Sequence, residues 1–187
     1  MIVRDPTAGG LTIEQTIAGR IERDHLARLV QYGRERARSA KGDRIVISRR
    51  GTERENIVGA VAEGIVAQRY GIRLPEDFGV HRGAPFDFLI RGQRVDVKGT
   101  ERFPAATFIG PRLIVRNPAA DAYFLVSVDT GNGCYRLLGW MDHARLISYP
   151  RLSRFDDARA VPWRELRAFL PQPSRWMPLE QRTAPPW

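Results

Sequence analysis

The stretch Pro85-Phe-Asp-Phe-Leu-Ile-Arg-Gly-Gln-Arg-Val-Asp-Val-Lys98 predicts two short strands joined by a turn at 91–92. Because side chains alternate between the faces of a strand, a two-residue loop there places Asp87 opposite Asp96, on one face with Lys98. The opposite face is apolar and carries Phe88, Ile90, Val95 and Val97. The hairpin therefore presents two opposed acids and a lysine on one side and a core-forming surface on the other.

Two carboxylates on neighbouring strands repel each other, so this arrangement requires a cation between them. Lys98 is one candidate for that cation, and a divalent metal ion is the other. Mg²⁺ prefers oxygen ligands, usually one or two carboxylates with several waters. Asp87 and Asp96 could clamp such an ion together with the carbonyl oxygen of Val97. Lys98 could then orient or deprotonate a water and balance charge that develops on a phosphate.

A helix is predicted from about Glu53 to Tyr70, ended by Gly71 in the C-cap position. Its segment 57–67 is apolar or small nearly all round, and Glu63 is the only charge in it. A buried carboxylate needs a partner or a raised pKa. The alternative is that Glu63 lies at the helix edge and reaches solvent.

These residues resemble the PD-(D/E)XK nuclease signature: Asp87 is followed nine positions later by Asp96-Val-Lys98, and Pro85 lies two residues before Asp87. Phe86 separates Pro85 from Asp87, so the literal Pro-Asp pair is absent. Glu63 resembles the acidic residue that the family carries on the preceding helix. The resemblance covers about residues 55–140.

The resemblance implies metal-dependent cleavage of nucleic acid, with Mg²⁺, or Mn²⁺ in its place, as the cofactor. It implies that Asp87 and Asp96 are metal ligands, that Lys98 is the catalytic lysine and that Glu63 is an accessory acid or a further ligand. It also implies an α/β fold: a restriction-endonuclease-like core in which a mixed central β-sheet is flanked by helices.

Three regions are expected along the chain: an N-terminal helical arm with a lead-in strand over 1–50, a nuclease core over 51–147, and a Pro/Trp-rich C-terminal extension over 148–187 packed on the core. Residues 100–120 are expected to be mostly irregular. The further expected elements are helices at 11–40, near Asp142 and at 161–170, and strands at 44–48, 113–116, 121–129 and 134–140.

The net charge of +9 predicts a polyanionic partner, and nucleic acid, DNA in particular, is the one we favour. A general preference for arginine in the source genome is the alternative. Lys41 and Lys98 are the only lysines, so the lysine beside Asp96 stands out in a chain that otherwise uses arginine. The expected nucleic-acid contacts, each with a plain solvated surface as the alternative, are Arg49, Arg50, His81, Arg82 and Arg112.

Other chemistries fit less well. His25, His81 and His143 lack the spacing of zinc ligands, and Cys134 is expected to be an inert core residue. The single cysteine and the absence of an apolar run long enough to span a membrane predict a cytoplasmic protein without a membrane partner. A homodimer would suit double-strand cutting. The alternatives to a nuclease are an inactive nucleic-acid-binding module of the same fold and a carboxylate-pair enzyme such as a glycosidase.

Overall fold

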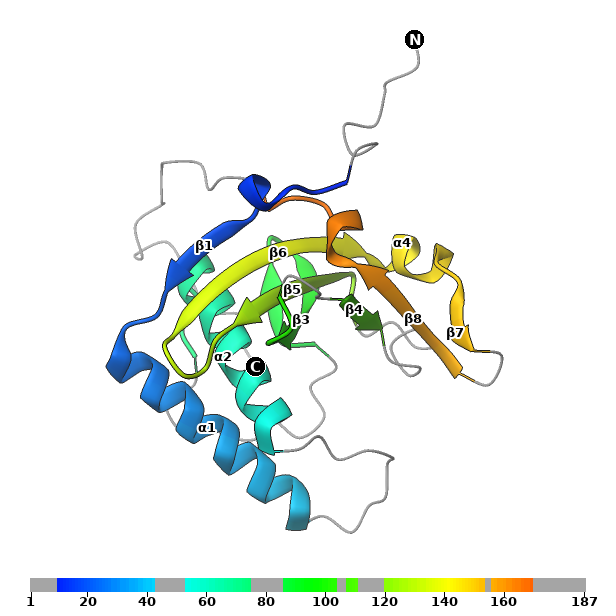
Figure 1. The fold of residues 1–187 in the computed structure, drawn as a ribbon. Coiled ribbons are helices and arrows are strands. Elements are labelled where there is room, and N and C mark those ends of the chain that lie inside the picture. Colours follow the sequence, from blue (N-terminus) through cyan, green and yellow to red (C-terminus); the bar gives the residue numbers. More distant parts are fainter. Residues whose placement is uncertain are drawn as a thin grey trace.

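The computed structural model describes residues 10–42, 53–74, 86–103, 107–110, 120–153 and 156–169. The fold is α/β and contains a curled, mixed sheet of five strands (Figure 1). Along this sheet the strands are β1 (Ile17–Arg20), β6 (Cys134–Asp142), β5 (Ala122–Val128), β3 (Gln93–Thr100) and β2 (Phe88–Ile90). Strands β3 and β5 run parallel, and the other neighbours are antiparallel.

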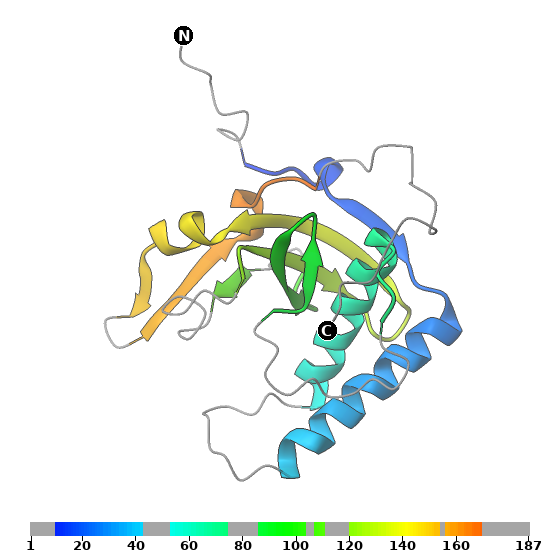
Figure 2. The same cartoon turned by 180° about the vertical axis from the view of Figure 1, so that it is seen from behind.

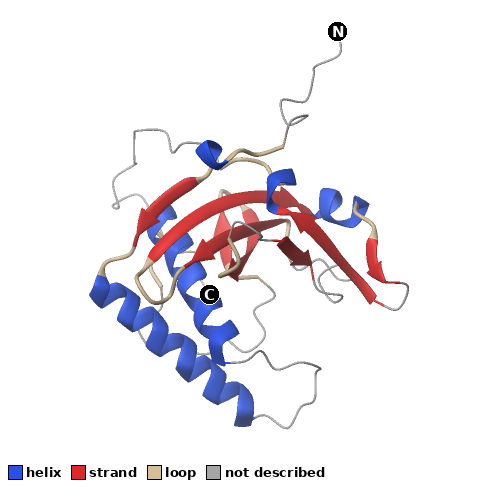
Figure 3. Ribbon diagram, in the orientation of Figure 1, coloured by secondary structure: helices blue, strands red, loops and turns tan. Residues whose placement is uncertain are grey.

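The two faces of the five-stranded sheet are covered differently (Figure 3). Helices α1 (Arg23–Gly42) and α2 (Glu53–Tyr70) pack on one face. The other face carries α4 (His143–Ser148), a 3-10 turn η2 (Trp163–Glu165) and a second sheet in the order β4 (Thr107–Gly110), β8 (Asp156–Pro162), β7 (Arg151–Ser153). A short 3-10 turn, η1 (Ile13–Gln15), precedes β1 in the chain.

Strand β5 is the shared wall of two hydrophobic cores, and all of its residues are buried. Phe124 and Val126 point toward α1 and α2, whereas Tyr123 and Leu125 join the core that contains Trp163. A strand covered on both faces reads as a continuous apolar run, which is why this segment is recognisable in the sequence.

The predicted hairpin register is confirmed from Phe88 to Val95, whereas Asp87 lies just before β2 and is not a strand partner of Asp96. Phe88 pairs with Val95 and Ile90 pairs with Gln93. The two loop residues Arg91 and Gly92 both have positive φ, 52° and 78°, as a type I′ turn requires. This turn matches the twist of the flanking strands and fixes which residues of β3 face each side.

Three glycines allow α2 to lie unusually close to its neighbours. A Cβ atom on Gly33 of α1 would lie 2.5 Å from the Cα of Ile57, and one on Gly64 of α2 would lie 2.4 Å from Leu29. A Cβ atom on Gly99 of β3 would lie 2.6 Å from the carbonyl oxygen of Val58. Any larger residue at these positions would push α2 away from α1 or from β3.

The elements expected at 53–70, 121–129 and 134–140, and the helix near Asp142, are confirmed. Gly71 ends α2 with a φ of 60°, and Ile72 N–H donates to the carbonyl oxygen of Ala67 at 2.8 Å. Asp142 caps α4 by accepting a hydrogen bond from the Arg145 N–H at 2.7 Å.

The expected helix at 11–40 is wrong over its first part. Residues Ile17–Arg20 form β1, which pairs with β6, and α1 begins only at Arg23. Gly19 lies under the ring of Tyr135, where a Cβ atom would be 2.5 Å from that ring. Pairing with β6 therefore decides the conformation of this segment, and its apolar spacing alone does not.

The helix expected at 161–170 is also wrong. Val161 and Pro162 end β8, which pairs with β4, and the chain then makes the η2 turn and a bridge from Arg167 to Trp140. Within 100–120, expected to be irregular, residues Thr107–Gly110 form β4. Cys134, expected in the core, is exposed.

Several expectations lie outside the described residues: the lead-in at 1–9, the strands at 44–48 and 113–116, and most of the tail. The division at residues 50 and 147 remains a prediction, although β1 belongs to the same sheet as β3 and β5. Among the described helices, none is long and apolar enough to cross a bilayer.

Two glycine substitutions test the close packing of α2. Gly33→Ala and Gly59→Ala gain the same helix propensity, but only the alanine at Gly33 meets backbone, whereas at Gly59 the nearest atom is 3.9 Å away. We expect Gly33→Ala to lower the free energy of unfolding by about 1–3 kcal/mol. Gly59→Ala should raise it by up to about 1 kcal/mol. Urea denaturation measures both, and equal effects would contradict the packing argument.

Candidate active site

A cavity of about 230 Å³ lies between α2 and the edge of β3. Strand β2 begins at Phe88, so no described strand pairs with that edge of β3 beyond Val95. Figure 2 shows the hairpin beside α2 at this point. The residues that line the cavity are Arg36, Glu55, Gly59, Glu63, Asp87, Asp96, Val97, Lys98 and Gly99. The structure thus brings together Glu63, Asp87, Asp96 and Lys98, the four side chains singled out in the sequence.

Asp87 continues the hairpin with one hydrogen bond from its backbone and one to its side chain. Its N–H donates to the carbonyl oxygen of Val95 at 3.0 Å, and its Oδ2 accepts from the N–H of Val97 at 2.6 Å. The N–H and C=O of one strand residue point to the same side, so the carbonyl of Val97 also faces the open edge. Val97 can therefore present a backbone oxygen next to the Asp87 carboxylate.

The pKa of Asp87 is raised from 3.8 to about 7. Burial is the largest cause, followed by the negative charges of Glu63 and Asp96. The hydrogen bond from Val97 and the charge of Lys98 oppose this rise but do not cancel it. The cavity accordingly holds more negative charge than its own cations neutralise.

Asp96 and Lys98 form an ion pair on one face of β3, with Lys98 Nζ 2.6 Å from Asp96 Oδ2. The side chain of Asp96 is only 13% exposed. Apart from this ion pair, the buried Oδ2 atom accepts no hydrogen bond from the described residues. A buried carboxylate oxygen with unused acceptor capacity suits a hard cation.

These observations test whether the residues fit a divalent ion. The oxygen donors available at the cavity edge are Asp87, Asp96 and the carbonyl of Val97, a set of the kind that Mg²⁺ takes. No group of three or more His, Cys, Asp or Glu side chains converges as a metal site within the described part of the chain. The donor set therefore fits an ion that keeps part of its water shell.

Glu63 points into the cavity and is mostly buried, which rules out the alternative that it reaches solvent from the helix edge. Its Oε1 accepts a hydrogen bond from Arg36 Nη1 of α1 at 2.7 Å. Burial disfavours the charge of Arg36, but Glu63 outweighs it and the pKa of Arg36 is raised. Tyr32, one turn earlier on α1, is hydrogen-bonded to Arg36, and burial followed by the Glu63 charge raises the pKa of Tyr32.

Arg36 and Glu55 line the cavity but were not expected there. In the sequence Arg36 is one of several arginines in the segment 11–40, and such a row suits either a solvated face or phosphate contacts. A signal was present, because Arg36 follows Leu29 and Gly33 at helical spacing, and both of those residues are buried. The expected nucleic-acid contacts Arg49, Arg50, His81, Arg82 and Arg112 all lie outside the described residues.

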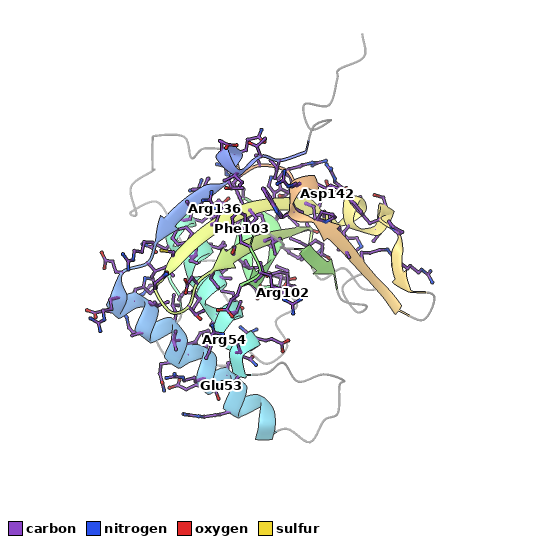
Figure 4. All side chains as sticks on the ribbon, viewed as in Figure 1. Glu53, Arg54, Arg102, Phe103, Arg136 and Asp142 are labelled. Atoms are coloured by element: carbon purple, nitrogen blue, oxygen red, sulfur yellow. The ribbon has the colours of Figure 1, made fainter. Side chains whose placement is uncertain are left out.

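A second cavity of about 670 Å³ lies on the other side of the first turn of α2. Arg54 of that turn makes two hydrogen bonds to Glu101, at 2.6 and 2.8 Å, whereas its neighbour Glu55 lines the first cavity. The guanidinium of Arg136 lies 5.2 Å from the ring centre of Phe103 in the second cavity. Figure 4 shows Arg54, Phe103 and Arg136.

Neither a family model, nor a curated protein, nor a solved structure matches this chain. The resemblance to PD-(D/E)XK nucleases therefore remains a prediction from the sequence.

The raised pKa of Asp87 predicts a pH-dependent stability of the metal-free protein. The folded state binds the Asp87 proton more tightly than the unfolded state, so stability should fall as the pH rises from about 4 to about 7. Asp87→Asn should flatten this dependence and stabilise the protein at pH 8 by roughly 2–4 kcal/mol, because the neutral amide still accepts from Val97. Thermal unfolding in EDTA from pH 5 to pH 8 measures the effect.

Asp121→Asn is the matched control. Arg94 lowers the pKa of Asp121 to about 2 through two side-chain hydrogen bonds, and this carboxylate lies at the surface. Its replacement should not stabilise the protein at pH 8. A gain for Asp121→Asn, or no gain for Asp87→Asn, would contradict the charge imbalance assigned to the cavity.

Proposed function

We propose that the protein is a metal-dependent nuclease that hydrolyses phosphodiester bonds of nucleic acid, with DNA as the favoured substrate. The observation that carries the proposal is the convergence of Glu63, Asp87, Asp96 and Lys98 on one cavity. The buried Asp96 Oδ2 makes no hydrogen bond among the described residues and is paired with the flexible side chain of Lys98, so a divalent ion could bind there. A net charge of +9 suits a polyanionic substrate.

We further propose that the five-stranded sheet contains a restriction-endonuclease-like core of PD-(D/E)XK type. Support comes from the order of elements: the acid-bearing helix α2, the hairpin β2–β3, and β5 parallel to β3. The acidic residues that these elements carry, Glu63, Asp87 and Asp96, line the cavity at the open edge of β3.

In this proposal Asp87, Asp96 and the Val97 carbonyl hold Mg²⁺, or Mn²⁺ in its place. The bound ion would supply a Lewis acid and a water of lowered pKa. The ammonium group of Lys98, 2.6 Å from Asp96, lies where it can orient a water and offset charge on a phosphate oxygen. Glu63 is held by its hydrogen bond from Arg36, and its negative charge lies close enough to Asp87 to raise the pKa of that carboxyl group.

Cleavage assays with single variants test the proposal. Supercoiled plasmid, linear duplex and single-stranded DNA or RNA are incubated with the protein in Mg²⁺, Mn²⁺ or EDTA. We expect cleavage with metal only, and a loss of about 10²–10⁴-fold in rate for Lys98→Ala and for Asp96→Asn, because each removes a group at the reacting phosphate.

Matched controls are available on α1. Lys41→Ala removes the only other lysine, and Asp24→Asn removes an exposed acid of the first turn. Both should cleave at close to the wild-type rate. If the wild type cleaves no nucleic acid with either metal, or if Lys98→Ala cleaves as fast as the wild type, the proposed nuclease activity is wrong. Salt-sensitive binding without cleavage would then favour the inactive nucleic-acid-binding module.

A further inference from the structure

The cavity contains two protein cations, and each is committed to a different carboxylate. Lys98 Nζ lies 2.6 Å from Asp96 Oδ2, and Arg36 Nη1 lies 2.7 Å from Glu63 Oε1. Asp87 has no ion-pair partner within the described part of the chain, although its carboxylate accepts the Val97 N–H. The acids are therefore divided into a Glu63 end held by the guanidinium of Arg36 and an Asp87–Asp96 end whose cation among the described residues is the ammonium of Lys98.

Arg36 is held at the Glu63 end by the packing of the helices. Gly33, one turn before Arg36, lets the α1 backbone approach Ile57, and Gly64, next to Glu63, receives the side chain of Leu29. Tyr32 is hydrogen-bonded to Arg36 from the preceding turn. The guanidinium is thus fixed on both sides, and it cannot be neutralised by loss of a proton.

A fixed guanidinium beside Glu63 excludes a metal ion from that position. A divalent ion bound to Glu63 would lie close to a permanent positive charge in a partly buried site, where repulsion is only weakly screened. The Asp87–Asp96 end has no such obstacle, because the ammonium of Lys98 is a compact group on a flexible stem that can move aside. A metal ion should accordingly enter at one end of the cavity only.

We propose that Arg36 is a positioning residue that takes the place of a second metal ion, so that the site binds one divalent ion between Asp87 and Asp96. The inference rests on the proposed metal site and goes beyond it by fixing the stoichiometry and the role of Glu63. Glu63 anchors Arg36 and is not a metal ligand while Arg36 is present. The guanidinium then faces the phosphate as a permanent cation opposite the metal ion.

Mn²⁺ titration of the metal-free protein tests this inference without requiring activity. Calorimetry, with free Mn²⁺ followed by electron paramagnetic resonance, should give one ion per chain for the wild type. Arg36→Gln should bind two, because Glu63 is released to act as a ligand, and Arg36→Lys should bind one, because a charge remains. The double variant Arg36→Gln/Glu63→Gln should return to one.

Arg38→Gln is the matched control, since Arg38 is an exposed arginine two residues further along α1. It should bind one ion, and circular dichroism should show that all variants are folded. Two ions in the wild type, one ion in Arg36→Gln, or two ions in the double variant would overturn the inference.

Cleavage measured on the same samples separates the two proposals. Cleavage by a wild-type protein that binds two ions would refute the inference and leave the nuclease standing. One ion without cleavage of any nucleic acid would refute the nuclease and leave the assigned role of Arg36 standing. If the folded wild type binds no Mn²⁺, the inference is overturned. Cleavage of nucleic acid by the same protein in EDTA would then show that it is a nuclease that does not depend on a metal ion.

Discussion

The close approach of α2 to α1 and to β3 fixes where the acidic side chains of the cavity lie. Gly33 and Gly64 set the distance between the helices, and Gly99 sets the distance from α2 to the sheet. An interior helix that is apolar on nearly all sides must be packed from several directions, and interiors of native density leave no room for an added methyl group at these contacts. The position of Glu63 in the cavity follows from this packing.

The cavity concentrates acids at a place where the backbone also has an open edge. Burial and the neighbouring acids raise the pKa of Asp87, while Asp96 keeps a buried oxygen without a donor among the described residues. Such an arrangement lowers the stability of the fold, and proteins retain it chiefly where a cation or a reaction uses it. The same cluster of buried acids therefore accounts for both the unfavourable electrostatic energy of the cavity and the chemistry proposed for it.

Local patterns predicted the parts of the fold that local physics controls. The loop Arg91-Gly92 adopts a turn that fixes the hairpin register, and Gly71 ends α2 as its position suggested. The wrong helix predictions at Ile17–Arg20 and at Val161 and Pro162 have a common cause. Each segment becomes a strand because a distant strand, β6 or β4, pairs with it, and the helical spacing of their apolar residues carries no information about that partner.

Local sequence is enough to predict that Asp87, Asp96 and Lys98 lie together, because a two-residue turn and the alternation of a strand are geometries of neighbouring residues. The hydrogen bond from Arg36 to Glu63, in contrast, could not be predicted from local sequence. These residues are 27 positions apart on different helices, and their contact depends on how closely α1 and α2 pack. A pattern read along one helix shows its buried stripe, but the partner of a charge on that stripe is set by the packing of the whole domain.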